Sequence, residues 1–119
     1  MAESILTSVK KVLGIDESDE SFDLDVTMHI NAAFSVLQQL GVGPSEGFAI
    51  SDANDDWSQF IGEDKRLNIV PSYVYMKVRS LFDPPTTGYL VEALKNQINE
   101  AEYRLANLVD IDPVVVVII

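Results

Sequence analysis

Apolar residues recur at three- and four-residue steps in four parts of the chain, which is the spacing of amphipathic helices that bury one face. The four predicted helices cover residues 3–13, 23–40, 67–82 and about 87–108. The first ends at Gly14, a residue suited to the left-handed position after a helix, and the last is about 33 Å long at 1.5 Å per residue. The apolar positions are Ile5, Leu6, Val9, Val12 and Leu13; Val26, Ile30, Ala33, Leu37 and Leu40; Val70, Val74, Val78 and Leu81; and Leu90, Leu94, Ile98, Ala101, Leu105 and Leu108.

Two adjacent prolines separate the last two predicted helices. A proline has no amide hydrogen to donate and its ring collides with the preceding turn, so Asp83, Pro84 and Pro85 force a break. Thr86 or Thr87 can then cap the helix that follows. The pattern predicts an all-α fold: a small bundle of about four helices, with a long helical hairpin broken at Asp83-Pro84-Pro85.

Residues 41–63 interrupt the helical pattern with four glycines, one proline and several acids. We expect a structured surface loop held by aromatic side chains, with one helical turn at residues 55–61. The helix predicted after this loop requires Pro71 to lie in its first turn, and the β-branched residues nearby also have strand character. The apolar residues of the loop are Phe48, Ile50, Trp57, Phe60 and Ile61.

A run of β-branched residues follows Pro113, and such residues favour an extended backbone. We therefore expect a helical domain at residues 1–112 and an extended tail at residues 113–119. Either the tail covers its own helices or is disordered, or it adds as a strand to the sheet edge of a partner, because exposed apolar residues would otherwise promote aggregation. The candidate partner-binding residues are Val114, Val115, Val116, Val117, Ile118 and Ile119.

The negative charge lies in the first half of the chain. Residues 1–64 contain 13 acids and only Lys10 and Lys11, whereas residues 65–119 contain six acids and six bases, for a net charge of −11. Such a surface repels phosphate, so sequence-specific DNA binding through a basic patch is not expected. The acids either solvate loops and keep the protein soluble, or form a face that does not stick to DNA.

The sequence offers little catalytic chemistry. It has no cysteine, and its single histidine, His29, lies mid-helix without a nucleophile motif nearby. We interpret His29 as a helix-surface or interface residue. There is also no glycine-rich phosphate-binding loop, so we expect neither an enzyme nor a bound cofactor.

One spacing resembles a calcium-binding loop. Asp52, Asn54, Asp56 and Glu63 fall at positions 1, 3, 5 and 12 of such a loop, where oxygen ligands are expected. However, Trp57 occupies the position that requires glycine, and the preceding glycine-rich stretch cannot be the entering helix. We therefore predict no metal site.

No membrane contact is expected either. The longest apolar run, residues 114–119, is far shorter than the roughly 20 residues that cross a bilayer. The first residues do not read as a secretory signal, and the absence of cysteine fits a reducing compartment. We expect a protein made in the cytoplasm.

Three stretches resemble the small head–tail connector (head completion) proteins of tailed bacteriophages. They are MHINAAFSVLQQLGVGPSEGFAI, DDWSQFIG and PSYVYMKVRSLFDPPTTGYLVEALKNQINEAEYRL. The resemblance covers most of residues 1–108 and implies a non-enzymatic, all-helical subunit that assembles as a ring, commonly twelvefold, beneath the portal after DNA packaging. Such a ring extends the DNA channel, through which DNA passes without sequence-specific binding, and provides a platform for tail completion or stopper proteins.

The resemblance also implies where the protein is found: made in the host bacterial cytoplasm and incorporated in the virion at the head–tail interface. Residues 114–119 would then reach the portal, although this tail is shorter and more apolar than is usual in the family. An alternative function is an acidic DNA mimic or regulatory inhibitor that binds a protein partner. An inhibitor of this kind should bind a DNA-binding protein in a salt-sensitive way, whereas a connector should form rings or cosediment with portals.

Overall fold

The computed structural model describes residues 3–110, which form five α-helices and one 3-10 helix. The all-α prediction is confirmed. The four predicted helices are α1, α2, α4 and α5, and the turn expected near Trp57 is α3, but the 3-10 helix was not predicted. The elements are α1 (Ile5–Val12), α2 (Asp23–Gln39), α3 (Trp57–Ile61), the 3-10 helix η1 (Lys65–Ile69), α4 (Val70–Phe82) and α5 (Gly88–Asp110).

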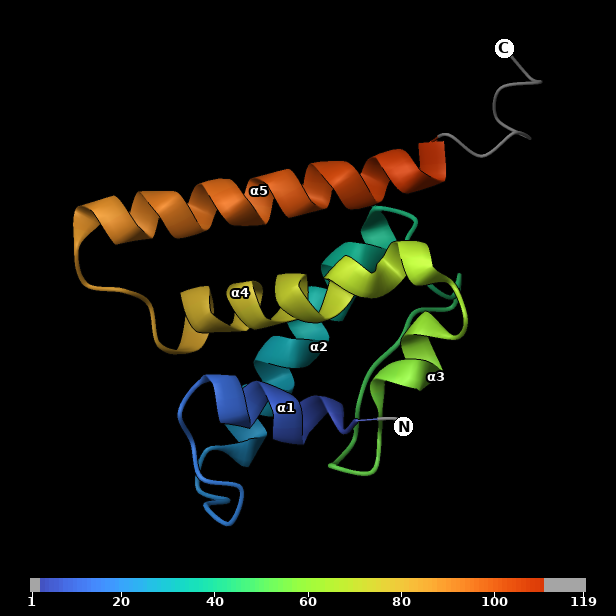
Figure 1. The fold of residues 1–119 in the computed structure, drawn as a ribbon. Coiled ribbons are helices and arrows are strands. Elements are labelled where there is room, and N and C mark those ends of the chain that lie inside the picture. Colours follow the sequence, from blue (N-terminus) through green and yellow to red (C-terminus); the bar gives the residue numbers. More distant parts are fainter. Residues whose placement is uncertain (1–2, 111–119) are drawn as a thin grey trace.

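Helix α4 lies in the middle of the fold, with α2 packed on one side and α5 on the other (Figure 1). Helix α1 packs against α2 below this layer. Helices α2 and α4 supply half of the buried apolar side chains, because the spacing of their apolar residues places these side chains on the faces that meet. The largest fully buried side chains are Tyr73, Phe34, Ile5, Ile30, Leu37 and Leu105.

Local signals in the sequence set the ends of the helices. The Ser4 hydroxyl accepts a hydrogen bond from the Thr7 backbone N–H at 3.2 Å and so caps α1. Gly14 follows this helix with φ of +80°, a left-handed conformation that favours glycine. Pro71 lies in the first turn of α4, where its missing N–H removes no helical hydrogen bond.

The loop between α2 and α3 is held by aromatic packing, as predicted. The Phe34 ring centroid lies 4.8 Å from that of Phe48 and 4.8 Å from that of Phe60. Asn31 of α2 adds a polar anchor: its side chain donates to the Ile50 carbonyl at 3.1 Å and accepts from the Ile50 N–H at 2.7 Å. The loop is therefore held along the C-terminal half of α2.

Two expectations from the sequence concern residues outside 3–110: the extended tail, and the absence of a membrane-spanning helix. The extended tail of residues 113–119, with its candidate portal contacts, lies outside the described residues, so its structure and the division at residue 112 stay predictions. Within residues 3–110, no helix combines the length and apolar character needed to cross a membrane.

Candidate assembly surfaces

The chain reverses direction at the two prolines, and α4 and α5 run antiparallel (Figure 1). Helix α4 ends where Asp83 leaves the helical conformation, with its N–H bonded to the Arg79 carbonyl at 3.0 Å. Helical hydrogen bonding resumes from the Thr87 carbonyl, which accepts from the Val91 N–H at 3.0 Å. The break thus falls where the sequence places it, and the first turns of α5 project past the end of α4 (Figure 1).

The projecting turns leave apolar side chains uncovered. Leu90 and Val91 are 51% and 42% exposed, and Leu81 at the end of α4 is 48% exposed. The sequence pattern placed Leu81 and Leu90 on buried stripes, yet no packed helix extends far enough to cover them. We call Leu81, Tyr89, Leu90 and Val91 the hairpin patch.

A groove of about 340 Å³ lies between α4 and α5 next to this patch. Two lysines line it and no acid does; the Lys77 Nζ is 3.9 Å from Glu102 Oε2, whereas Lys95 makes no ion pair or hydrogen bond within residues 3–110. The groove is therefore apolar with a positive edge. The residues of this hairpin groove are Lys77, Ser80, Pro84, Pro85, Val91, Leu94, Lys95, Ile98 and Asn99.

A partly buried polar contact joins α5 to α4. The Tyr73 hydroxyl donates to Glu102 Oε2 at 2.8 Å. Burial raises the pKa of Tyr73, and the hydrogen bond to the Glu102 carboxylate raises it further. The phenol consequently stays protonated as a donor, and the contact helps to hold the two helices in one register.

A second exposed apolar surface lies at the start of α2. Leu24 and Met28, one helical turn apart, are 73% and 60% exposed and point away from the core. Asp25 stands beside them, and no lysine or arginine occurs in residues 12–64. We call Leu24, Asp25 and Met28 the α2 outer face.

The other side of α2 packs against the end of α4. The Phe22 ring meets the Phe82 ring edge-on at 5.6 Å, and the His29 ring lies 6.3 Å from Phe82. His29 is half-buried in this aromatic contact. This position agrees with a packing or interface role for the histidine.

The acid-rich loop between α1 and α2 is organised around Lys10, which sequence reasoning missed. Lys10 is only 3% exposed, and its ammonium donates to the carbonyls of Glu17 at 3.1 Å and Asp19 at 2.7 Å. The ammonium also lies 2.7 Å from Asp23 Oδ1, a buried oxygen that has no other partner. The ammonium therefore makes two hydrogen bonds and one ion pair.

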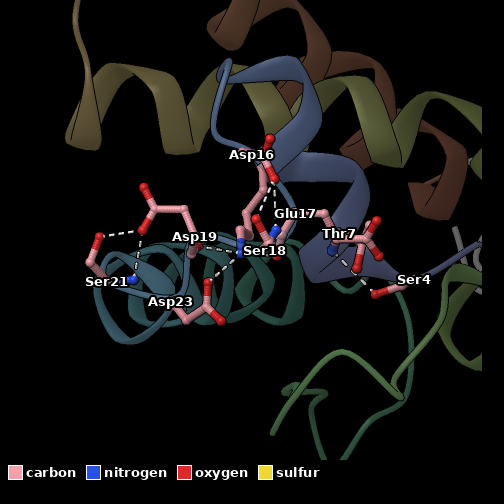
Figure 2. Close-up of polar contacts among 9 residues, drawn as sticks. Ser4, Thr7, Asp16, Glu17, Ser18, Asp19, Ser21 and Asp23 are labelled. Atoms are coloured by element: carbon pink, nitrogen blue, oxygen red, sulfur yellow. Dashed lines mark hydrogen bonds and ion pairs between the residues drawn. The ribbon is translucent and has the colours of Figure 1, made fainter.

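Acids of the same loop also fold it locally (Figure 2). Asp16 Oδ1 accepts from the Ser18 hydroxyl at 2.7 Å and from its N–H at 2.9 Å, and Asp19 accepts the same two bonds from Ser21. These hydrogen bonds lower the pKa of both carboxyls, and the bond from the serine hydroxyl has the larger effect. The loop thus presents ionised carboxylates in fixed turns.

The residues with calcium-loop spacing serve turns and caps. Asp52 Oδ1 accepts from the Asn54 N–H at 2.8 Å, and Asp56 caps α3 by accepting from the Gln59 N–H at 3.2 Å. Among the described residues, no group of three or more acidic or histidine side chains could hold a metal ion. Asp52 and Asp56 thus order the backbone before and at the start of α3.

Exposed apolar surfaces on a helical frame are typical of proteins that work through contacts with other chains. Residues 5–111 match the family model described as phage connector protein, so the chain belongs to that family. No curated protein and no solved structure gives a significant match to the chain. Membership indicates a structural, head–tail connector role as a virion component associated with other head or tail proteins, rather than an enzymatic role.

Proposed function

We propose that the protein assembles as a closed, twelvefold ring beneath the portal and there extends the DNA channel. The observation that carries this proposal is the number of large apolar side chains that one subunit leaves exposed, because adjoining exposed apolar residues mark interaction sites. In residues 3–110 they are Val12, Phe22, Leu24, Met28, Leu81, Tyr89, Leu90, Val91 and Tyr103.

The α4–α5 hairpin suits a ring subunit because it is stiff. The two prolines fix the turn, and the bond from Tyr73 to Glu102 fixes the register of the helices. Ring contacts of this kind are heterologous: one surface of each subunit meets a different surface of the next, and the rotation closes. The rim of the assembled ring would then serve as the platform for tail completion or stopper proteins.

The acid-rich first half of the chain faces the channel in this proposal. Lys10 neutralises part of the charge of the 16–23 loop, but Asp16 and Asp19 stay ionised and exposed. Repeated around a ring, such carboxylates repel the DNA phosphates and let DNA pass without sequence-specific binding. An assembled ring whose channel wall is basic or apolar would contradict this orientation.

Residues 114–119 contact the portal in the same proposal. Deleting them should abolish attachment to portal-containing heads, because the six apolar residues supply the anchor. The circular dichroism spectrum should not change, since the described core lies within residues 3–110. Normal attachment by the truncated protein would remove the tail from the interface.

Electron microscopy of the purified protein, with and without purified portal, tests the ring itself. We expect rings on the portal, or rings at high protein concentration, and cosedimentation of the protein with portal. Salt-sensitive capture of a DNA-binding protein, with no ring and no portal binding under any condition, would instead favour the acidic inhibitor.

A further inference from the structure

Two surfaces of the subunit are complementary in charge and similar in their apolar character. The hairpin groove combines Val91, Leu94 and the two prolines with Lys77 and Lys95, and no acid lines it. The α2 outer face combines Leu24 and Met28 with Asp25, in a part of the chain that has no base after Lys11. The groove has bases but no acid, and the α2 outer face has an acid but no base.

The two surfaces do not cover each other within one chain. Leu24 is 73% exposed and Val91 is 42% exposed in the same subunit. Lys95 on the groove and Asp25 on the outer face are both exposed, and neither makes an ion pair within residues 3–110. Any contact between the surfaces therefore joins two copies.

We propose that the α2 outer face of one copy docks in the hairpin groove of the next copy. This inference rests on the proposed ring and names its interface. Leu24 and Met28 pack against Val91 and Leu94 of the neighbouring groove, and Asp25 lies beside the neighbour's Lys95.

The pairing of unlike surfaces is the kind of contact from which rings are built. Each contact leaves one free groove at one end of the growing oligomer and one free outer face at the other, and a ring forms when the rotation between neighbours brings these two ends together. A groove of about 340 Å³ admits side chains rather than a whole helix, so Leu24 and Met28 act as anchors inside a wider contact. A stable interface of this kind buries more than about 1,000 Å² in total.

Charge reversal across the contact tests the pairing. Lys95→Glu and Asp25→Lys should each raise the concentration for half-maximal self-association at least roughly tenfold, because each places like charges together. The double variant Lys95→Glu/Asp25→Lys should recover most of this loss. Sedimentation velocity at several concentrations, at low salt and with portal present in a second series, measures the effect.

Matched controls carry the same charge changes elsewhere. Lys65→Glu and Glu63→Lys alter exposed residues that make no ion pair in the described structure and do not line the hairpin groove. They should change self-association less than about twofold, within the range of long-range charge effects. Melting temperatures of all variants by circular dichroism separate loss of contact from loss of folding.

A disulfide trap tests the geometry directly, because the chain has no native cysteine. Under oxidation, a mixture of Leu24→Cys and Val91→Cys proteins should give crosslinked dimers, whereas either variant alone should give few. The double variant Leu24→Cys/Val91→Cys should give a ladder of oligomers. Ala53→Cys, on an exposed loop, replaces Leu24→Cys in the control mixture and should not crosslink to Val91→Cys.

Each contrary result overturns a distinct statement. If the wild type forms rings but charge reversal, charge swap and crosslinking behave like the controls, this interface is wrong and the ring stands. If Lys95→Glu weakens attachment to heads but not self-association, the groove holds another head or tail protein. If the wild type does not self-associate and the cysteine variants do not crosslink, with or without portal, both the ring and the interface fail.

Discussion

The acid-rich first half of the chain and the α4–α5 hairpin use their side chains in opposite ways. In the first half, charged groups are engaged locally: Lys10 binds three oxygens of the 16–23 loop, and Asp16 and Asp19 each hold a turn. The hairpin is nearly neutral, but it leaves Leu90 and Val91 uncovered. The loop of residues 16–23 contributes a folded, charged surface, whereas the hairpin, like the α2 outer face, contributes apolar surface that has no partner within the subunit.

The sharpest contrast lies within α5, where residues of one apolar pattern differ in burial. Leu105→Ala should lower the free energy of unfolding by about 4 kcal/mol, because the side chain is fully buried and its loss leaves a cavity. Leu90→Ala should lower it by less than about 0.5 kcal/mol, since half of Leu90 is exposed. Urea unfolding of both variants measures the difference.

The same pair of variants separates folding from assembly. Leu90→Ala should weaken self-association or portal binding although its fold is intact, because this side chain belongs to the hairpin patch. A large loss of stability in Leu90→Ala would mean that the residue is covered within the subunit, and the distinction between core and hairpin patch would then fail.

The second prediction concerns the first half of the chain. Lys10→Ala should cost about 3 kcal/mol of unfolding free energy, because it leaves a buried Asp23 oxygen without its ion-pair partner and two loop carbonyls without their donor. Lys11→Ala is the matched control: Lys11 is exposed, so the change should cost less than about 0.5 kcal/mol. Equal effects of the two substitutions would show that the 16–23 loop is not organised around Lys10.

These examples show how much the sequence could predict. Periodicity and the two prolines located α1, α2, α4 and α5 correctly, because helix formation and proline geometry are local. The short 3-10 helix at Lys65–Ile69 was not predicted, because so short an element shows no periodic spacing of apolar residues.

The surfaces were harder to predict because they depend on distant packing. Periodicity assigned Leu81 and Leu90 to apolar faces, but only the packed helices show that no neighbour reaches them. The role of Lys10 depends on the path of a loop seven to nine residues away, which brings two carbonyls to the ammonium. A hint was present, because Lys10 and Lys11 are the only bases of residues 1–64.

A third prediction tests whether the loop after α2 is as fixed as its aromatic packing indicates. Gly43 has φ of +90°, and a Cβ atom there would lie 2.5 Å from Cε1 of the Phe60 ring. Gly43→Ala should therefore cost about 2 kcal/mol through strain and overpacking. Gly14→Ala has a similar φ of +80° but open space around it, so it should cost about 1 kcal/mol. Both variants carry the backbone strain of a positive φ, but only Gly43→Ala adds a clash. The difference between their losses of stability in thermal unfolding therefore measures the cost of the clash.

The smallest expected effect is the acid dependence of the 16–23 loop. Hydrogen bonds from Ser18 and Ser21 hold the pKa values of Asp16 and Asp19 below the ordinary value of 3.8 in the folded state. The resulting stability is fully present above that value and is lost as the pH falls through the lowered folded pKa values. The double variant Ser18→Ala/Ser21→Ala should therefore unfold at a slightly higher pH than the wild type in an acid titration followed by circular dichroism.

Solvent screening keeps this shift small, because both carboxylates are exposed. Ser35→Ala, an exposed serine of α2 without a bonded carboxylate, is the control and should leave the acid midpoint unchanged. An unchanged midpoint in the double variant as well would mean that the turns do not persist in solution. The carboxylates of the first half would then be loosely solvated, and the contrast with the hairpin would be one of charge alone.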